Sequence, residues 1–153
     1  MSRIKTVRQF VEEKLKSLPS DKRNKALAHL NGVSMAAGII ADKRGENVEC
    51  ACIAGLLHDM QAYTSGSYDD HAHLGAKLAE KYLKKLDIVT EEEKEMICSA
   101  IYHHDDKASV DAPFDEVLKD ADVVHHTMAD PLKPVKEKEQ ARYAALRKEF
   151  GFE

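Results

Sequence analysis

Residues 48–59 read VECACIAGLLHD, in which eight consecutive small or apolar residues lead directly into an ionisable pair, His58 and Asp59. The hydrophobicity of this stretch fits either a buried strand or a buried helix. Its Ala, Cys and Gly content, with few β-branched residues, favours a helix. Burying charged groups costs several kcal/mol unless a partner compensates them. The sequence therefore predicts a buried helix that ends in a histidine–aspartate pair with a compensating partner.

Helical periodicity continues on both sides of this stretch. Residues 20–43 carry one apolar stripe at steps of three and four, with Ser20 as the expected N-cap and Gly45 as the expected stop. We expect further helices at residues 1–18, 71–86, 90–104, 113–128 and 135–150, and a loop at residues 61–70. Thr90 and Glu93 form a capping-box pattern.

The absence of any hairpin or strand-pair signal completes this interpretation. We predict an all-α protein with one domain, residues 1–153, built as a bundle of about six to seven helices. Residues 20–130 would form its core, and the charged helix at 135–150 would pack on that core. That last helix either covers the domain or mediates a homodimer through Tyr143 and Leu146.

Composition narrows the classes of function. Charged residues make up 33% of the chain, and the net charge of −4 argues against a nucleic-acid surface. No stretch approaches the roughly 18 apolar residues of a membrane span, and the N-terminus is amphipathic rather than a signal peptide. The three cysteines lack CxxC spacing and are expected to be reduced and buried. We therefore expect a cytoplasmic protein with neither a nucleic-acid partner nor a membrane partner.

A divalent metal is the partner that would compensate His58 and Asp59, because it uses an imidazole and a carboxylate together. The stretch LKDADVV (118–124) offers another carboxylate in an apolar setting. Asp122 is expected to point inward, whereas Asp120 lies on the opposite side of the helix and is expected at the surface or behind the ligands. His125 and His126 share the face of Asp122 and are expected at the surface or behind the ligands.

These residues resemble the H…HD…D signature of the HD superfamily of metal-dependent phosphohydrolases. The resemblance covers residues 26–130 through AHLNGV (28–33), AGLLHD (54–59) and LKDADVV (118–124). It implies an all-α domain that holds one or two divalent metals between its core helices. It also implies that the first metal is bound by His29, His58, Asp59 and Asp122.

Two further motifs resemble those of dinuclear members of the superfamily. HAHLGA (71–76) makes His71 the matching ligand of a second metal and leaves His73 spare. SAIYHHDD (99–106) makes His104 the matching ligand, with His103 as a competitor. The alternative for these histidines is a polar helix edge that lines a cleft.

The resemblance also implies a mechanism. Mixed imidazole and carboxylate ligation favours Mn, Fe, Co or Zn over Mg. Hydrolysis would proceed through a metal-activated hydroxide, with Asp59 and His58 as catalytic residues and Asp59 bridging two ions. Lys107 would contact a substrate phosphate, unless it is simply a solvated loop lysine. The expected enzyme is a hydrolase of a phosphoester or phosphoanhydride in a small phosphorylated molecule that resembles a nucleotide.

The substrate is less well indicated than the chemistry. HAHLGA and SAIYHH resemble most the branch that hydrolyses symmetrical dinucleoside tetraphosphates, but the continuation ADVVHHTMADP (121–131) departs from that branch. One alternative is a catalytically idle HD-fold module that binds a nucleotide or regulates a partner. Another is oxidative chemistry at a di-iron centre.

Overall fold

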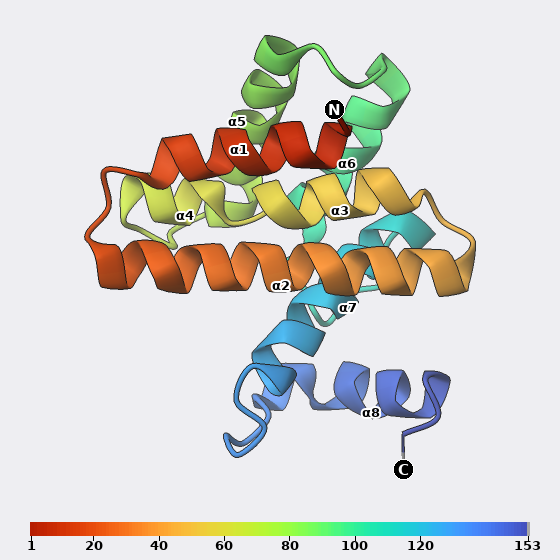
Figure 1. The fold of residues 1–153 in the computed structure, drawn as a ribbon. Coiled ribbons are helices and arrows are strands. Elements are labelled where there is room, and N and C mark those ends of the chain that lie inside the picture. Colours follow the sequence, from red (N-terminus) through yellow and green to blue (C-terminus); the bar gives the residue numbers. More distant parts are fainter. Residues whose placement is uncertain (153) are drawn as a thin grey trace.

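Helices make up the regular secondary structure of residues 1–152, the part of the chain that the structure describes (Figure 1). In chain order, the computed structural model contains α1 (Arg3–Leu15), α2 (Ser20–Arg44), α3 (Val48–Leu57), α4 (Met60–Ser65), α5 (His71–Leu86), α6 (Glu91–His103), α7 (Pro113–Met128), the 3₁₀ helix η1 (Glu137–Glu139) and α8 (Gln140–Glu149). No strand occurs within residues 1–152, so the prediction of an all-α fold is confirmed.

Helix α3 is the buried centre of the fold, as its composition predicts. The Asn47 side chain caps it by accepting a hydrogen bond from the backbone N–H of Cys50. Residues 53–57 of α3 are all buried. Gly55 sits against α2 so closely that an added Cβ would lie 2.6 Å from the Cα of Ser34. The small side chains of α3 therefore allow α1 and α2 to pack on it, and Figure 1 shows α2 and α3 running side by side.

Helix α2 extends over residues 20–44 and carries the predicted buried stripe. Gly45 ends it in a left-handed conformation (φ 72°), as predicted. The expected N-cap was wrong by one residue: Ser20 is the first helical residue, and Pro19 precedes it without a side-chain cap. The stripe packs α2 against both α3 and α7.

Helix α4 corrects the prediction that residues 61–70 form a loop. Residues 60–65 are helical, and Gly66 ends this turn at φ 75°. The Ser, Thr and Gly content is typical of a turn, but Met60 and Ala62 are buried, and this tertiary packing overrides local propensity. The extra helix raises the number of α-helices in residues 1–152 from the predicted six or seven to eight.

Helices α5, α6 and α7 match their predicted ranges closely. Thr90 and Glu93 form the expected capping box at the start of α6. Pro113 occupies the first turn of α7, where its missing N–H costs nothing. Helix α5 packs on α6, and α7 crosses the bundle in contact with α2, α3 and α6. These contacts bring the middle of α2, the end of α3 and the middle of α7 together.

Helix α8 packs on α7 at the end of the chain (Figure 1). It is shorter than expected, because residues 137–139 form a 3₁₀ turn before it. Leu146 is buried in the core of its own chain, and Tyr143 packs against that core. This arrangement favours the covering role of the helix, since Leu146 is not available to a second copy.

Two further predictions concern the membrane and the cysteines. None of the helices in residues 1–152 combines the length and the apolar character that a membrane span requires. Cys50, Cys52 and Cys98 are all free. Cys50 is buried as expected, whereas Cys52 and Cys98 are only partly buried.

Candidate metal centre

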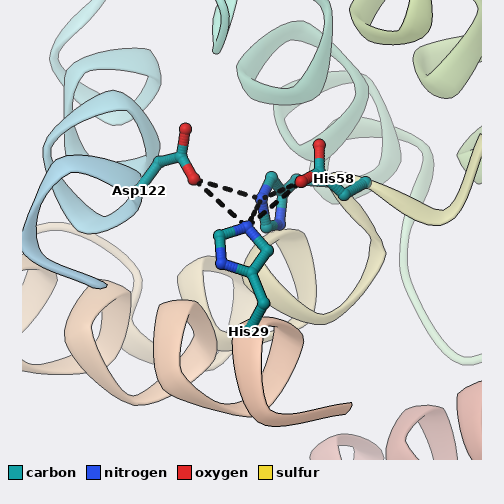
Figure 2. Close-up of side chains that lie close together, drawn as sticks. His29, His58 and Asp122 are labelled. Carbon is teal, nitrogen blue, oxygen red and sulfur yellow. Dashed lines mark hydrogen bonds and ion pairs between the residues drawn. The ribbon is translucent and has the colours of Figure 1, made fainter. Parts of the chain in front are cut away.

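Four predicted ligands from three parts of the chain converge at the centre of the bundle. His29 comes from the middle of α2, His58 and Asp59 from the junction of α3 and α4, and Asp122 from α7. Figure 2 shows the rings of His29 and His58 and the carboxylate of Asp122 facing one another. The Nε2 atom of His29 lies 3.1 Å from Nε2 of His58, 3.1 Å from Oδ2 of Asp59 and 3.3 Å from Oδ1 of Asp122.

These distances fit the ligands of a single cation. The Nε2 atom of His58 lies 3.3 Å from Asp59 Oδ2 and 3.5 Å from Asp122 Oδ1. Ligand atoms bonded at about 2.1 Å lie about 3.0 Å apart in an octahedral site and about 3.4 Å apart in a tetrahedral one. All four residues are buried, so bulk water does not solvate the two carboxylates. Their negative charge therefore needs a compensating cation.

Backbone carbonyl groups orient the imidazoles. The Nδ1–H of His58 donates to the carbonyl oxygen of Gly55 at 2.7 Å, because a carbonyl can only accept. The proton of neutral His58 therefore lies on Nδ1, and its Nε2 lone pair faces the cluster. Such outer partners fix the tautomer of metal-binding histidines. His29 has a different partner, since its Nδ1 lies 2.8 Å from Nδ1 of His125.

A second group shares Asp59 with the first. The Oδ1 atom of Asp59 lies 3.5 Å from Nε2 of His71 and 3.3 Å from Nε2 of His104. The Nδ1–H groups of these histidines donate to backbone carbonyls, His71 to Tyr68 at 2.9 Å and His104 to Ile101 at 2.7 Å. Asp59 thus turns one oxygen toward each group, which is the arrangement expected of a carboxylate that bridges two cations.

The structure separates the competing histidines. His104 lies in the second group, whereas His103 points elsewhere and donates from Nδ1 to the carbonyl of Ser99 at 2.8 Å. His73 is exposed, stacks on Tyr102 and pairs with Asp70 at 2.8 Å. The geometry therefore brings His71 and His104 to Asp59 and leaves His73 and His103 outside the cluster.

Two orphaned oxygens test whether the cluster fits a metal. Oδ1 of Asp59 and Oδ1 of Asp122 are buried and have no hydrogen-bond partner. Buried carboxylate oxygens are normally satisfied. Here their nearest neighbours include the Nε2 atoms of His58 and His104, whose Nδ1–H groups already donate to backbone carbonyls. A divalent cation between these atoms would be bound by the carboxylate oxygens and the imidazole nitrogens together. The residues present therefore fit a metal.

Electrostatics lead to the same conclusion. Burial by itself lowers the pKa of His58, but Asp59 and Asp122 outweigh it and raise that pKa to about 10. Burial would raise the pKa of Asp59, but His58, His104 and His29 hold it well below its usual range. Burial lowers the pKa of His104, which favours its neutral form. The carboxylates are thus ionised, and without a metal the ammonium group of Lys107 beside Asp122 and a proton on His58 compensate them.

Lys107 is part of the cluster rather than a solvated loop residue. Its side chain is buried, and Nζ donates to Oδ2 of Asp122 at 2.8 Å and to the carbonyl of His104 at 2.6 Å. The ammonium group holds one oxygen of Asp122 and leaves the other facing the histidines. Contact between Lys107 and a substrate phosphate stays a prediction.

Three residues near the cluster were not identified as its components from the sequence. Nε2 of His126 lies 3.4 Å from Asp122 Oδ1, and its Nδ1 lies 2.7 Å from buried Glu139. The spacing of four residues between Asp122 and His126 was a usable signal, whereas nothing marked Glu139. Asp120 was expected at the surface or behind the ligands, and its burial between Arg44 and Arg142 excludes the surface position.

Comparison with known proteins adds a family to this geometry. The chain is 39% identical to ribonuclease Y of Mycoplasma mycoides over 82 residues, which is 53% of this chain and 18% of that protein. It is 38% identical to ribonuclease Y of Campylobacter curvus over 80 residues, 52% of this chain and 14% of that protein. The chain thus matches less than a fifth of the length of either relative.

The profile of the HD domain family matches residues 26–127. This range is more than half of the chain, and it contains His29, His58, Asp59 and Asp122, together with His71 and His104. The predicted resemblance is confirmed: this chain belongs to the HD domain family.

Proposed function

We propose that this protein is a metal-dependent phosphohydrolase that cleaves a phosphoester or phosphoanhydride bond. One observation carries the proposal: two buried carboxylate oxygens, on Asp59 and Asp122, have no hydrogen-bond partner. An imidazole that a backbone carbonyl orients lies beside each of them, His58 beside Asp122 and His104 beside Asp59. This arrangement fits one cation at His29, His58, Asp59 and Asp122 and a second at Asp59, His71 and His104.

Each residue has a distinct task in this proposal. Bound divalent metals lower the pKa of water and stabilise charge on phosphoryl oxygens. The imidazole-rich ligand set favours Mn, Fe, Co or Zn over Mg. Asp59 holds the two positions together through its two oxygens. His58 and His104, which are almost completely buried, keep water away from the inner side of the centre.

Residues on the outer side support a substrate that resembles a nucleotide. Tyr68 is 61% exposed, and its ring lies 5.3 Å from the ring of His71 in an edge-on arrangement. Exposed aromatic rings stack on nucleobases. Tyr68 would therefore hold a base while the phosphate reaches the metals. The expected contact of Lys107 with a substrate phosphate gains no support, because its buried ammonium group is already paired with Asp122.

RNA is a second candidate substrate, because the relatives are named as ribonucleases. The nucleotides of RNA are joined by phosphodiester bonds, which the same metal chemistry would cleave. Against RNA stand the net charge of −4 and the fact that the buried cation at the centre, Lys107, is already paired with Asp122. We therefore place the small molecule first, and we drop the firm exclusion of a nucleic-acid partner.

The test starts from protein reconstituted with Mn²⁺ or Co²⁺ and assayed on two substrate sets. One set contains nucleoside mono-, di- and triphosphates and dinucleoside polyphosphates, and the other contains short labelled RNAs. We expect phosphate or nucleotide release from the first set, and at least about 10³-fold less with Asp59→Asn, as for loss of central catalytic groups. His104→Ala should lose activity, whereas the neighbouring His103→Ala should keep it.

The outcomes separate the alternatives. Faster cleavage of RNA than of any small molecule would move RNA to first place. Metal-loaded protein that turns over neither set would favour the idle binding module. Oxygen consumption by Fe(II)-loaded protein, without hydrolysis, would favour oxidative chemistry.

A further inference from the structure

A buried glutamate from the C-terminal segment reaches the metal centre through a histidine. Glu139, in η1, is 1% exposed. Its Oε1 accepts a hydrogen bond from the Nδ1–H of His126 at 2.7 Å. Its Oε2 is also buried and has no hydrogen-bond partner. Glu139 lies outside residues 26–127, the range that matches the HD domain family.

The hydrogen bond to Glu139 determines which nitrogen of His126 is free. A carboxylate only accepts, so the Nδ1 atom of His126 carries a proton. In neutral His126 the Nε2 lone pair therefore faces Asp122 Oδ1, which lies 3.4 Å away and has no partner. Two electron-rich atoms thus face each other at the spacing expected of two ligands on one cation, about 3.0–3.4 Å.

The same pattern occurs at the proposed ligands of the first group. His58 donates from Nδ1 to a backbone carbonyl, and its Nε2 lies 3.5 Å from the same oxygen of Asp122. The ring of His126 is nearly parallel to that of His29, with the centroids 5.3 Å apart. His126 therefore presents Nε2 to Asp122 Oδ1 with Nδ1–H held by an acceptor, as His58 does.

We propose that His126 Nε2 is a further protein ligand of the metal centre, which binds a divalent cation jointly with Asp122 Oδ1, and that Glu139 orients it. A neutral imidazole adds no charge, and the carboxylate behind it raises its basicity as a ligand. The 3₁₀ turn at residues 137–139 is then part of the metal centre. This inference concerns ligands alone and does not depend on hydrolysis.

The test measures metal binding rather than activity. Metal-free protein is titrated with Co²⁺, and the visible absorption of the bound ion reports both affinity and coordination. We expect His126→Ala to weaken Co²⁺ binding by about 10–100-fold, as large as the effect of losing a partner behind a ligand. The absorption bands should also change. Glu139→Gln keeps the size of the side chain and removes its charge. It should weaken binding by about 10–100-fold, as removal of a partner behind a ligand does.

His103→Ala is the matched control, because His103 also ends a helix beside a buried carboxylate, Asp115 at 3.5 Å, but points away from the cluster. It should bind Co²⁺ like the unmodified chain. Wild-type affinity and an unchanged spectrum in His126→Ala would overturn the proposal. Far-UV circular dichroism checks folding, and if His126→Ala does not fold, the affinity of Glu139→Gln decides. Weaker binding in a chain without hydrolase activity would support this inference and contradict the proposed function.

Discussion

Two of the buried aspartates of helix α7, Asp120 and Asp122, obtain their compensating charge from different sources. Asp120 lies between two arginines, with Arg44 at 2.8 Å and Arg142 at 3.1 Å. Asp122 has Lys107 on one oxygen at 2.8 Å, while its other oxygen faces histidines and has no partner. Both side chains are more than nine-tenths buried.

The difference between these two aspartates is the source of the compensating charge. On the Asp120 side the chain supplies permanent cations, and the network continues through Glu116 and Glu149. On the Asp122 side the chain supplies mainly imidazoles, which are permanent ligands but not permanent cations. Burial of an aspartate alone therefore does not mark a metal site. The mark is an unpartnered oxygen among oriented imidazoles.

The largest effects on metal affinity and stability should come from replacing the carboxylate of either aspartate by an amide. We expect Asp122→Asn to lower metal affinity by more than about 100-fold, beyond the effect of losing an outer partner. Asp120→Asn should leave metal content unchanged. It should lower the free energy of unfolding by about 1–3 kcal/mol through lost charged hydrogen bonds.

Elemental analysis after reconstitution and thermal unfolding would measure the two losses. If Asp120→Asn lost metal as readily as Asp122→Asn, the division between a structural face and a metal face of α7 would be wrong. A loss of stability in Asp120→Asn with full metal content would sharpen that division.

The next effect is a dependence of stability and metal affinity on pH, because on the Asp122 side a proton on His58 supplies part of the compensating charge. The pKa of His58 in the metal-free fold is raised to about 10, above its ordinary value of 6.5. Its contribution to stability is therefore fully present below pH 6.5 and is lost as the pH rises through about 10. Metal binding must displace this proton, so metal affinity should rise about tenfold per pH unit in the same window.

Thermal unfolding of chelator-treated protein at pH 6–10, beside metal-loaded protein, would check this dependence. The Asp120 network should not contribute, because its partners are arginines. A melting temperature of metal-free protein that stays level or rises across this window would contradict a protonated His58 between the carboxylates.

The smallest effect on metal affinity should come from adding a methyl group at Gly32, beside the histidine that contacts His29. A Cβ at Gly32 would lie 2.1 Å from Cδ2 of His125, whose ring contacts His29. Gly32→Ala should therefore displace His125, cost about 1 kcal/mol of stability and weaken metal binding several-fold. Gly38→Ala, which meets Sγ of Cys52 at 2.7 Å on another part of α2, should lower stability without changing metal affinity. Equal metal affinity in the two variants would remove His125 from the support of the centre.

The sequence predicted most of the helices because they depend on local patterns, whereas the convergence of the main cluster was implied by the resemblance to the HD superfamily. Helices α5 and α7 begin and end where apolar periodicity indicates, and Pro113 marks the start of α7. Helix α4 was missed because only tertiary burial of Met60 and Ala62 stabilises it. The choice between His103 and His104 needed coordinates, since α6 ends between them and they face different directions.

Glu139 shows the limit of pattern reading most clearly. It lies in the highly charged run VKEKE (135–139), which is typical of a solvated helix face. Only the packing of η1 and α8 against the rest of the chain buries this one carboxylate. The sequence left the position of Asp120 open for a related reason, because its partners Arg44 and Arg142 are remote in sequence.

The separation of the proposed ligands along the chain has a consequence for biosynthesis. His29 leaves the ribosome first, the pair at 58–59 follows, and Asp122 comes 93 positions after His29 (122 − 29). A nascent chain without α7 offers only part of the ligand set, and sites of this kind rarely form before folding. Any cation caught earlier would exchange freely with its surroundings. Selection among metals would therefore be made by the finished fold, after translation has passed α7, and not by the order in which ions meet the growing chain.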